Sequence, residues 1–289
     1  MDDLAEYYRK LVVKLFIVFL VLELLAAIGY FQVIYPTRLA NAYIAELRQS
    51  TLSLQRQLGE TAATVAAPVF YDPKRAYQAS QDDLRDAEAQ IKLATEELSR
   101  FRRQSESLRP LTLTGYVEVY KKAQVHQRQA SNIAGQSSEI LTEYARAVEY
   151  LQALGKAQYM YESKAAALND ALAAQSSAGL QFETDMAELS AMAERLRGLS
   201  PPASLKESQA ATIGYLERLQ EAYRGIVMGL VSPTYDQLPG HTLLLAQQTE
   251  NYYATGKGAA VAALKDAKLL QDVVSLRTKT AQLLESTAK

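Results

Sequence analysis

Residues 84–108 read LRDAEAQIKLATEELSRFRRQSESL, and the spacing of their apolar and small side chains decides the fold class. These side chains recur in steps of three and four residues: Leu84, Ala87, Ile91, Ala94, Leu98, Phe101, Ser105 and Leu108. An average step of about 3.5 residues keeps one stripe of a helix facing a partner helix, as in a coiled coil. The stretch therefore predicts a helix that packs lengthwise against another helix at a small crossing angle.

Two other parts of the chain carry stripes with the same spacing. The first consists of Ala40, Ile44, Leu47, Thr51, Leu54, Leu58, Thr61 and Val65. The second consists of Ile133, Ser137, Ile140, Tyr144, Ala147, Leu151, Leu154, Gln158, Tyr161, Ala165, Leu168, Leu172, Gln175, Gly179, Phe182, Met186, Leu189 and Ala193. No strand-like alternation longer than a few residues competes with these stripes. The pattern is typical of an all-α protein.

The unbroken second stripe leaves two interpretations of residues 114–199. As one helix they would extend about 130 Å, because a helix rises about 1.5 Å per residue. As a helical hairpin they would turn at residues 175–179 or at Gly155-Lys156. We favour the hairpin, because compact bundles are commoner than long rods and Ser-Ser-Ala-Gly is suitable turn chemistry.

Clusters of proline and glycine divide the chain after residue 35 into helical segments. They fall at residues 68–73, 109–110, 200–202 and 232–240. The predicted helices cover about residues 37–67, 74–108, 114–175, 180–199, 203–231 and 242–287. The segments differ in length and share no recurring signature, so the sequence favours a helical bundle over a repeat array.

Residues 15–35, LFIVFLVLELLAAIGYFQVIY, form an apolar run that Glu23 alone interrupts with a charge. A helix of this length just crosses a hydrocarbon core of about 30 Å. The competing interpretation is a cleaved secretory signal, but the run exceeds the roughly 7 to 15 residues of a signal-peptide core. A lipoprotein is excluded because the chain contains no cysteine. We predict a single N-terminal transmembrane helix, a signal-anchor, followed by an elongated, coiled-coil-like antiparallel helical bundle.

Basic residues near the span predict its orientation. Arg9, Lys10 and Lys14 precede the span, and Arg38 and Arg48 follow it. This distribution favours a cytoplasmic tail at residues 1–14, an anchor at residues 15–35 and an extracytoplasmic bundle at residues 36–289, which is periplasmic in a Gram-negative organism. Lys14, Tyr30 and Tyr35 are expected to lie at the membrane interfaces, where amphipathic and basic side chains gather.

Glu23 is the side chain whose predicted position most needs an explanation. A carboxylate near the middle of a bilayer costs about 2.5 to 3.5 kcal/mol on insertion scales and usually pairs with a partner or carries a proton. We expect Glu23 to contact a partner helix, with Ala26, Ala27 and Gly29 allowing a close approach. A proton-carrying carboxylate in an ion-driven complex is the alternative.

The composition gives no support to catalysis, a cofactor or a metal. The chain has no cysteine and only two histidines, His126 and His241, more than one hundred residues apart. His126 is expected to be a solvated helix residue, and the carboxylate pairs Asp82-Asp83, Glu96-Glu97 and Asp185-Glu188 are expected to lie on solvated helix faces. We therefore predict no catalytic, cofactor-binding or metal-binding residue, and a protein that is not an enzyme.

Net charge argues against nucleic acid as a partner. Three of the 31 basic and four of the 32 acidic side chains lie in residues 1–35, which leaves 28 of each in the rest of the chain. A neutral body lacks the basic excess that nucleic-acid binding requires.

The 18 tyrosines are the remaining unusual feature of the composition. Five lie at or near stripe positions and are expected in the core: Tyr144, Tyr159, Tyr161, Tyr215 and Tyr223. Near the predicted distal loop, Tyr235, His241, Tyr252 and Tyr253 are candidates for a contact surface.

These observations favour a non-enzymatic structural or assembly subunit of a larger membrane complex. Its expected partners are the lipid bilayer and other membrane subunits, or further copies of the chain, that contact the anchor helix. One alternative is a helical sensory ectodomain, similar in outline to the ligand-binding domains of bacterial chemoreceptors. With only about fourteen cytoplasmic residues, such a sensor would act through a partner. The other alternative is an ion-driven motor or energy-coupling subunit that uses Glu23.

Overall fold

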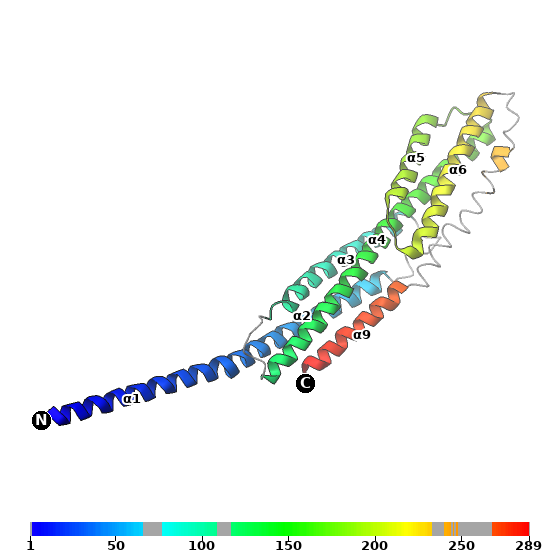
Figure 1. Cartoon of the computed structure of the whole chain (residues 1–289). Coiled ribbons are helices and arrows are strands. Elements are labelled where there is room, and N and C mark those ends of the chain that lie inside the picture. Colours follow the sequence, from blue (N-terminus) through cyan, green and yellow to red (C-terminus); the bar gives the residue numbers. More distant parts are fainter. Residues whose placement is uncertain are drawn as a thin grey trace. The chain divides into compact units, whose positions relative to one another are not determined.

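A computed structural model describes residues 2–65, 77–108, 117–232, 240–243, 245, 247 and 268–288. In these ranges every regular element is helical and no strand occurs, which confirms the all-α prediction for them (Figure 1). The elements are α1 (Asp2–Gly29), the π-helical turn η1 (Tyr30–Ile34), α2 (Tyr35–Val65), α3 (Tyr77–Ser105), α4 (Glu118–Ala174), α5 (Phe182–Gly198), the 3₁₀ turn η3 (Ala203–Leu205), α6 (Lys206–Val231) and α9 (Lys268–Ala288). The predicted breaks at 68–73 and 109–110 lie outside the described residues, as does most of the predicted helix at 242–287 before residue 268.

The chain forms two compact units. Unit 1 comprises Met1–Arg56, Glu96–Ser137 and Leu276–Lys289, and unit 2 comprises Gln57–Thr95 and Ser138–Ser275. Four helices, α2, α3, α4 and α9, therefore contribute residues to both units.

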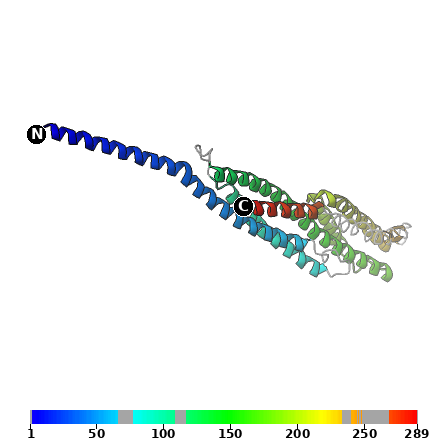
Figure 2. The same cartoon turned by 90° about the horizontal axis from the view of Figure 1, so that it is seen from below.

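Unit 1 is a helical bundle in which parts of α2, α3, α4 and α9 lie side by side (Figures 1 and 2). Its core includes Leu47, Leu54, Phe101, Tyr120, Ile133 and Leu283, which are all buried. Polar contacts join the same helices: the Tyr43 hydroxyl donates to the Ser105 carbonyl at 3.3 Å, and Lys279 Nζ donates to Gln136 Oε1 at 2.8 Å. The buried apolar side chains stabilise this unit, because their packing removes apolar area from water.

Unit 2 builds its core around the later part of α4, together with α5 and α6. The cluster includes Tyr150, Tyr161, Leu168, Leu189, Leu216 and Tyr223, of which none is more than 1% exposed. Within this unit the hydroxyls of Tyr150 and Ser208, both buried, lie 2.8 Å apart and share a hydrogen bond. Buried tyrosine hydroxyls need such partners, because an unpaired polar group costs about 1–3 kcal/mol.

The predicted stripes are largely buried. All eight members of the stripe at residues 84–108 are buried. In the stripe that begins at Ala40, Ile44 is half-buried and its neighbour Tyr43 is buried instead. Val65 lies among the residues whose side chains are not described. The sequence pattern therefore located most of the helix faces that form the core.

A turn at residues 175–181 separates α4 from α5, at the first of the two sites considered for a hairpin. The Ser176 N–H donates to the Ala171 carbonyl at 3.1 Å, and the Gln175 N–H donates to the Leu172 carbonyl at 3.2 Å. These two bonds form a Schellman motif, which requires a left-handed residue at the helix end. That residue is Gln175, with a φ of 51°. Gly155 and Lys156 lie inside α4.

The helix of the N-terminal segment continues past Pro36 by changing its winding. The Tyr35 N–H donates to the Tyr30 carbonyl, an i to i+5 bond that defines the π-helical turn η1. Proline within a helix clashes with the carbonyl four residues earlier and cannot donate a hydrogen bond. A wider turn just before Pro36 makes room for the proline ring, and α2 follows η1 without a break.

Candidate functional site

The first candidate site is the apolar surface of α1 and η1. Every residue in 11–34 is exposed, including large side chains such as Phe16, Phe19, Leu22 and Phe31. The continuous helical stretch Leu11–Thr64 is long and apolar enough to cross a membrane. None of its most apolar 18 residues is buried. A soluble protein rarely exposes so many neighbouring apolar side chains, so this surface needs lipid or protein against it.

Glu23 lies within this apolar surface. Ala26 and Ala27 follow it by three and four residues and therefore share its helix face, whereas Gly29 lies toward the side of Ala26. A Cβ atom added at Gly29 would meet nothing within 4 Å. Within the described part of the chain, Glu23 has no hydrogen-bond or ion-pair partner. The helix thus presents a carboxylate beside small side chains, an arrangement that suits contact with a second helix.

The predicted interfacial anchors lie at the two ends of the apolar run. Lys14 and Tyr30 are exposed, and Tyr35 is half-buried. The ring of Phe31 contacts Tyr30 edge-on, with centroids 5.4 Å apart, and lies 6.3 Å from the ring of Tyr35. These three neighbouring aromatic residues form the C-terminal end of the apolar run.

The predicted contact surface is only partly covered by the structure. Tyr235, Tyr252 and Tyr253 lie outside the described residues. His241 is half-buried and packs on α6, where a Cβ atom at Gly225 would overlap the imidazole ring. Gly225 is therefore the residue that gives His241 its space.

The second candidate site is a buried polar cluster in unit 2, formed by Lys164 of α4, Asp185 and Glu188 of α5 and Tyr223 of α6. Asp185 is only 6% exposed and Tyr223 is fully buried. Lys164 Nζ donates to Asp185 Oδ1 and, at 2.9 Å, binds Glu188 Oε2, while the Tyr223 hydroxyl donates to Asp185 Oδ2. Three helices thus converge on one carboxylate.

The prediction that Asp185 lies on a solvated face is wrong. The residue shares a 4-3-4 spacing with Leu189, Met192 and Leu196, which are buried on the same face of α5. A buried carboxylate is retained only when it is paired and hydrogen-bonded. The lysine and the tyrosine satisfy this requirement.

Electrostatics in the cluster follow from burial and from these contacts. Burial raises the pKa of Tyr223 above its ordinary value, and the hydrogen bond and negative charge of Asp185 raise it further. For Lys164, burial favours the neutral form, but the hydrogen bonds and charges of Asp185 and Glu188 outweigh it and raise the pKa. The cluster therefore holds a protonated tyrosine and a charged lysine around neutral pH.

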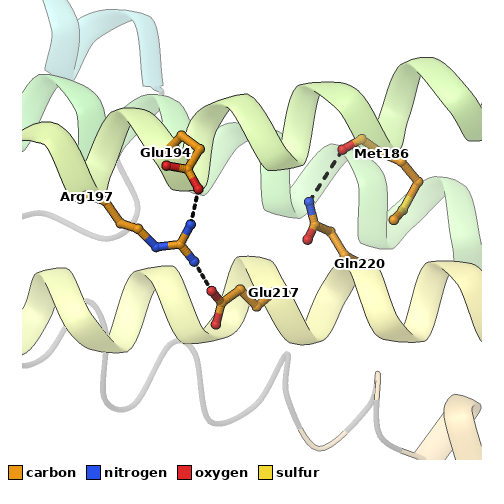
Figure 3. A network of polar contacts seen from close by, with 5 residues as sticks. All are labelled: Met186, Glu194, Arg197, Glu217 and Gln220. Carbon is orange, nitrogen blue, oxygen red and sulfur yellow. Dashed lines mark hydrogen bonds and ion pairs between the residues drawn. The ribbon is translucent and has the colours of Figure 1, made fainter.

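Further polar contacts join α5 and α6 (Figure 3). Arg197 binds Glu194 on its own helix and Glu217 on α6, and Gln220 Nε2 donates to the Met186 carbonyl at 3.4 Å. Arg197 is 42% exposed, so water screens its ion pairs and their contribution to stability is small.

Two other sequence predictions need correction. His126 is 8% exposed rather than solvated, and its Nδ1 lies 3.5 Å from the Ser286 hydroxyl. Tyr159, expected in the core, is 58% exposed. Tyr144, Tyr161, Tyr215 and Tyr223 are buried as predicted.

The described residues contain no group of three or more histidine, cysteine, aspartate or glutamate side chains placed to hold a metal ion. In its described ranges the chain is all-helical, with one apolar N-terminal helix and a helical bundle. No protein-family model, curated protein or solved structure significantly matches the chain.

Proposed function

We propose that the protein is a non-enzymatic, membrane-anchored structural or assembly subunit. In this proposal α1 and η1 cross the membrane once, and the helical bundle docks on partners in a larger membrane complex. The observation that carries the proposal is the exposed apolar surface of residues 11–34, which contains Glu23, a carboxylate with no partner among the residues that the structure describes.

The membrane topology is part of the proposal. We place residues 1–14 in the cytoplasm and the bundle on the other side of the membrane, in the periplasm if the organism is Gram-negative. The distribution of Arg9, Lys10, Lys14, Arg38 and Arg48 supports this orientation through the positive-inside rule.

The bundle is proposed to pack as an antiparallel, coiled-coil-like assembly of helices. The contacts between α2 and α3 support this arrangement, because the partner on α3 moves backward along the chain as the partner on α2 moves forward. The pairs are Tyr43 with Ser105, Glu46 with Gln104, Ser53 with Glu97 and Gln57 with Gln90. A scaffold of this kind offers long helix faces to partners.

The Glu23 contact can be tested in the membrane. Replacing Glu23 with Leu is expected to reduce recovery of the partner chains, or of the homo-oligomer, because the polar contact is lost. Glu23→Gln should keep most of the assembly, since a carboxamide still forms hydrogen bonds. The measurement is the mass of the complex and the set of co-purifying chains after purification in a mild detergent.

Val18→Leu is the matched control, because it changes an apolar residue on another face of α1 and leaves Glu23 intact. If Glu23→Leu yields the same complex as Val18→Leu, the proposal that Glu23 contacts a partner helix in the membrane is wrong. If Glu23→Gln assembles normally but abolishes a proton-coupled activity of the complex, Glu23 belongs to an energy-coupling subunit instead.

A further inference from the structure

A groove in unit 2 lies between α4 and α5, beside the buried cluster of Lys164 and Asp185. Its volume is about 540 Å³, and its lining includes Lys156, Tyr159, Met160, Lys164, Met192 and Arg195. Sites for small organic ligands usually measure about 300–1,000 Å³ and combine an apolar surface with a few polar groups. The groove fits this description in both size and lining.

Cations outnumber carboxylates in the lining. Lys156, Lys164 and Arg195 face one carboxylate, Glu188. Glu188 already binds Lys164, which the buried Asp185 also neutralises. In the described ranges of the chain, neither Lys156 nor Arg195 forms an ion pair or hydrogen bond. Two cations are therefore available to an incoming anion.

These two cations lie toward the same end of the groove. Lys156 precedes Lys164 by eight residues on α4, and Arg195 follows Glu188 by seven residues on α5. The turn at 175–181 reverses the chain, so Lys156 and Arg195 both lie on the side of the Lys164–Glu188 contact that is farther from the turn. Each is about 10–12 Å along its helix from that contact, at 1.5 Å per residue. Arginine is well suited to bind a carboxylate or phosphate with two parallel hydrogen bonds.

Apart from Ser163, the rest of the lining is largely apolar, and its methionines are adaptable. Met192 is buried, Met160 is half-buried, and the exposed ring of Tyr159 stands at the edge. Methionine side chains adjust their shape and make favourable contacts with aromatic rings. Lys164 is held in place by Asp185, which Tyr223 also binds, so one wall of the groove is fixed before any ligand arrives.

We infer that this groove binds a small organic anion, with its charged group between Lys156 and Arg195 and its apolar body against Met160 and Met192. The proposal is independent of the membrane function. It adds a binding site for a ligand class that pairs one acidic group with an aromatic or aliphatic body.

The test uses the full chain in lipid nanodiscs and isothermal titration calorimetry, with empty nanodiscs as the blank. The probes are 4-phenylbutanoate, its neutral analogue 4-phenylbutanamide, and acetate, which has the charge without the apolar body. We expect saturable binding of 4-phenylbutanoate at about millimolar concentration, and binding at least about tenfold weaker for each of the other two.

The double variant Lys156→Gln/Arg195→Gln should weaken binding of 4-phenylbutanoate by about tenfold or more. The matched control, Lys206→Gln/Arg218→Gln, removes two cations of α6 outside the groove lining and should leave binding unchanged. All four positions are exposed, and circular dichroism and thermal unfolding check that both variants keep the native fold.

Three results would overturn the inference. The first is the absence of saturable binding of 4-phenylbutanoate up to about 10 mM. The second is equal binding of the acid and the amide, or of the acid and acetate. The third is an equal loss of binding in the groove variant and in the control.

Discussion

Asp185 shows how a single carboxylate can tie three helices together. It accepts a hydrogen bond from Lys164 of α4 and one from Tyr223 of α6, and it lies on α5 between them. Charged pairs in protein interiors lose hydration on folding, so they add little net stability compared with apolar packing. Removing one partner is costly, however, because the other is left buried and unsatisfied.

Tyr223→Phe should therefore destabilise unit 2 by about 1–3 kcal/mol near neutral pH, since Asp185 loses a donor. The substitution should also change the pH dependence. The raised pKa of Tyr223 means that its contribution to stability is complete below the ordinary pKa of 10.0 and is lost as the pH rises above it. The free energy of unfolding of the native chain should fall above about pH 10, by at most about 1.4 kcal/mol per pH unit for this group.

Denaturant unfolding between about pH 8 and pH 11.5 measures this effect. The decline with pH should be shallower in Tyr223→Phe than in the native chain. Tyr159→Phe, at an exposed tyrosine, serves as the control and should follow the native chain. An identical pH profile for Tyr223→Phe and the native chain would show that the hydroxyl of Tyr223 does not couple to folding.

The burial of Asp185 and His126 could not be read from local sequence, because the groups that cover them are distant in the chain. Asp185 is satisfied by residues 21 positions before it and 38 after it, and His126 lies next to Ser286, 160 positions away. Polar residues give no apolar signal of their own. Spacing alone pointed to burial: Asp185 has a 4-3-4 spacing with Leu189, Met192 and Leu196, and His126 lies four residues before the buried Ala130.

At the scale of elements, the turn between α4 and α5 begins with a residue that is poorly suited to its conformation. Gln175 adopts a φ of 51°, in a region where a side chain costs about 1–2 kcal/mol relative to glycine. Gln175→Gly should stabilise the chain by up to about 1 kcal/mol, part of the gain being offset by the greater freedom of glycine in the unfolded state. Thermal and denaturant unfolding measure the change.

Gly179→Ala is the matched control in the same turn. Gly179 does not have a positive φ, and a Cβ atom there would meet nothing within 4 Å. Alanine should therefore be neutral or slightly stabilising at this position. A destabilised Gln175→Gly variant together with a destabilised Gly179→Ala variant would contradict the described turn.

Helix faces were the most predictable part of the fold, and helix ends were less so. The stripe at 84–108 repeats without an error because its first seven members share one buried side of α3, and Leu108, just after the end of the helix, is buried as well. The turn at 175–181 preserved the spacing of the stripe, so periodicity could not distinguish a hairpin from a rod. The glycine in the predicted turn is also not its left-handed residue, because the hydrogen bonds at the end of α4 place that conformation at Gln175.

On the scale of the whole molecule, the apolar and the charged parts of the chain are strongly segregated. Residues 11–34 are exposed and almost entirely apolar, whereas the rest of the chain carries balanced charges. Among the described side chains, the buried ones of both units all lie after residue 35, and those of residues 11–29 in α1 are exposed. In the part of the chain that the structure describes, residues 11–34 contribute no buried side chain to the bundle.

A variant that lacks residues 1–35 is expected to fold and to remain in solution without detergent. Its circular dichroism should stay helical, and its unfolding midpoint should match that of the full chain to within a few degrees, about 1 kcal/mol or less. The full chain should stay with membranes after an alkaline carbonate wash, and the shortened variant should be released. Retention of the shortened variant in the membrane fraction would show that another segment provides the anchor.

The π-helical turn η1 also sets the angle, around the helix axis, between Glu23 and the buried face of α2. Each residue of an α-helix advances by about 100° around the axis, because a turn contains 3.6 residues. The bond from Tyr35 to Tyr30 encloses one residue more than an α-helical turn does. In an uninterrupted helix, Glu23 would point in one fixed direction relative to the buried stripe that begins at Ala40. The extra residue rotates Glu23 by about 100° from that direction. Five residues of backbone thus decide which way Glu23 faces relative to the buried face of α2, and deletion of one of them should turn the carboxylate by about 100°.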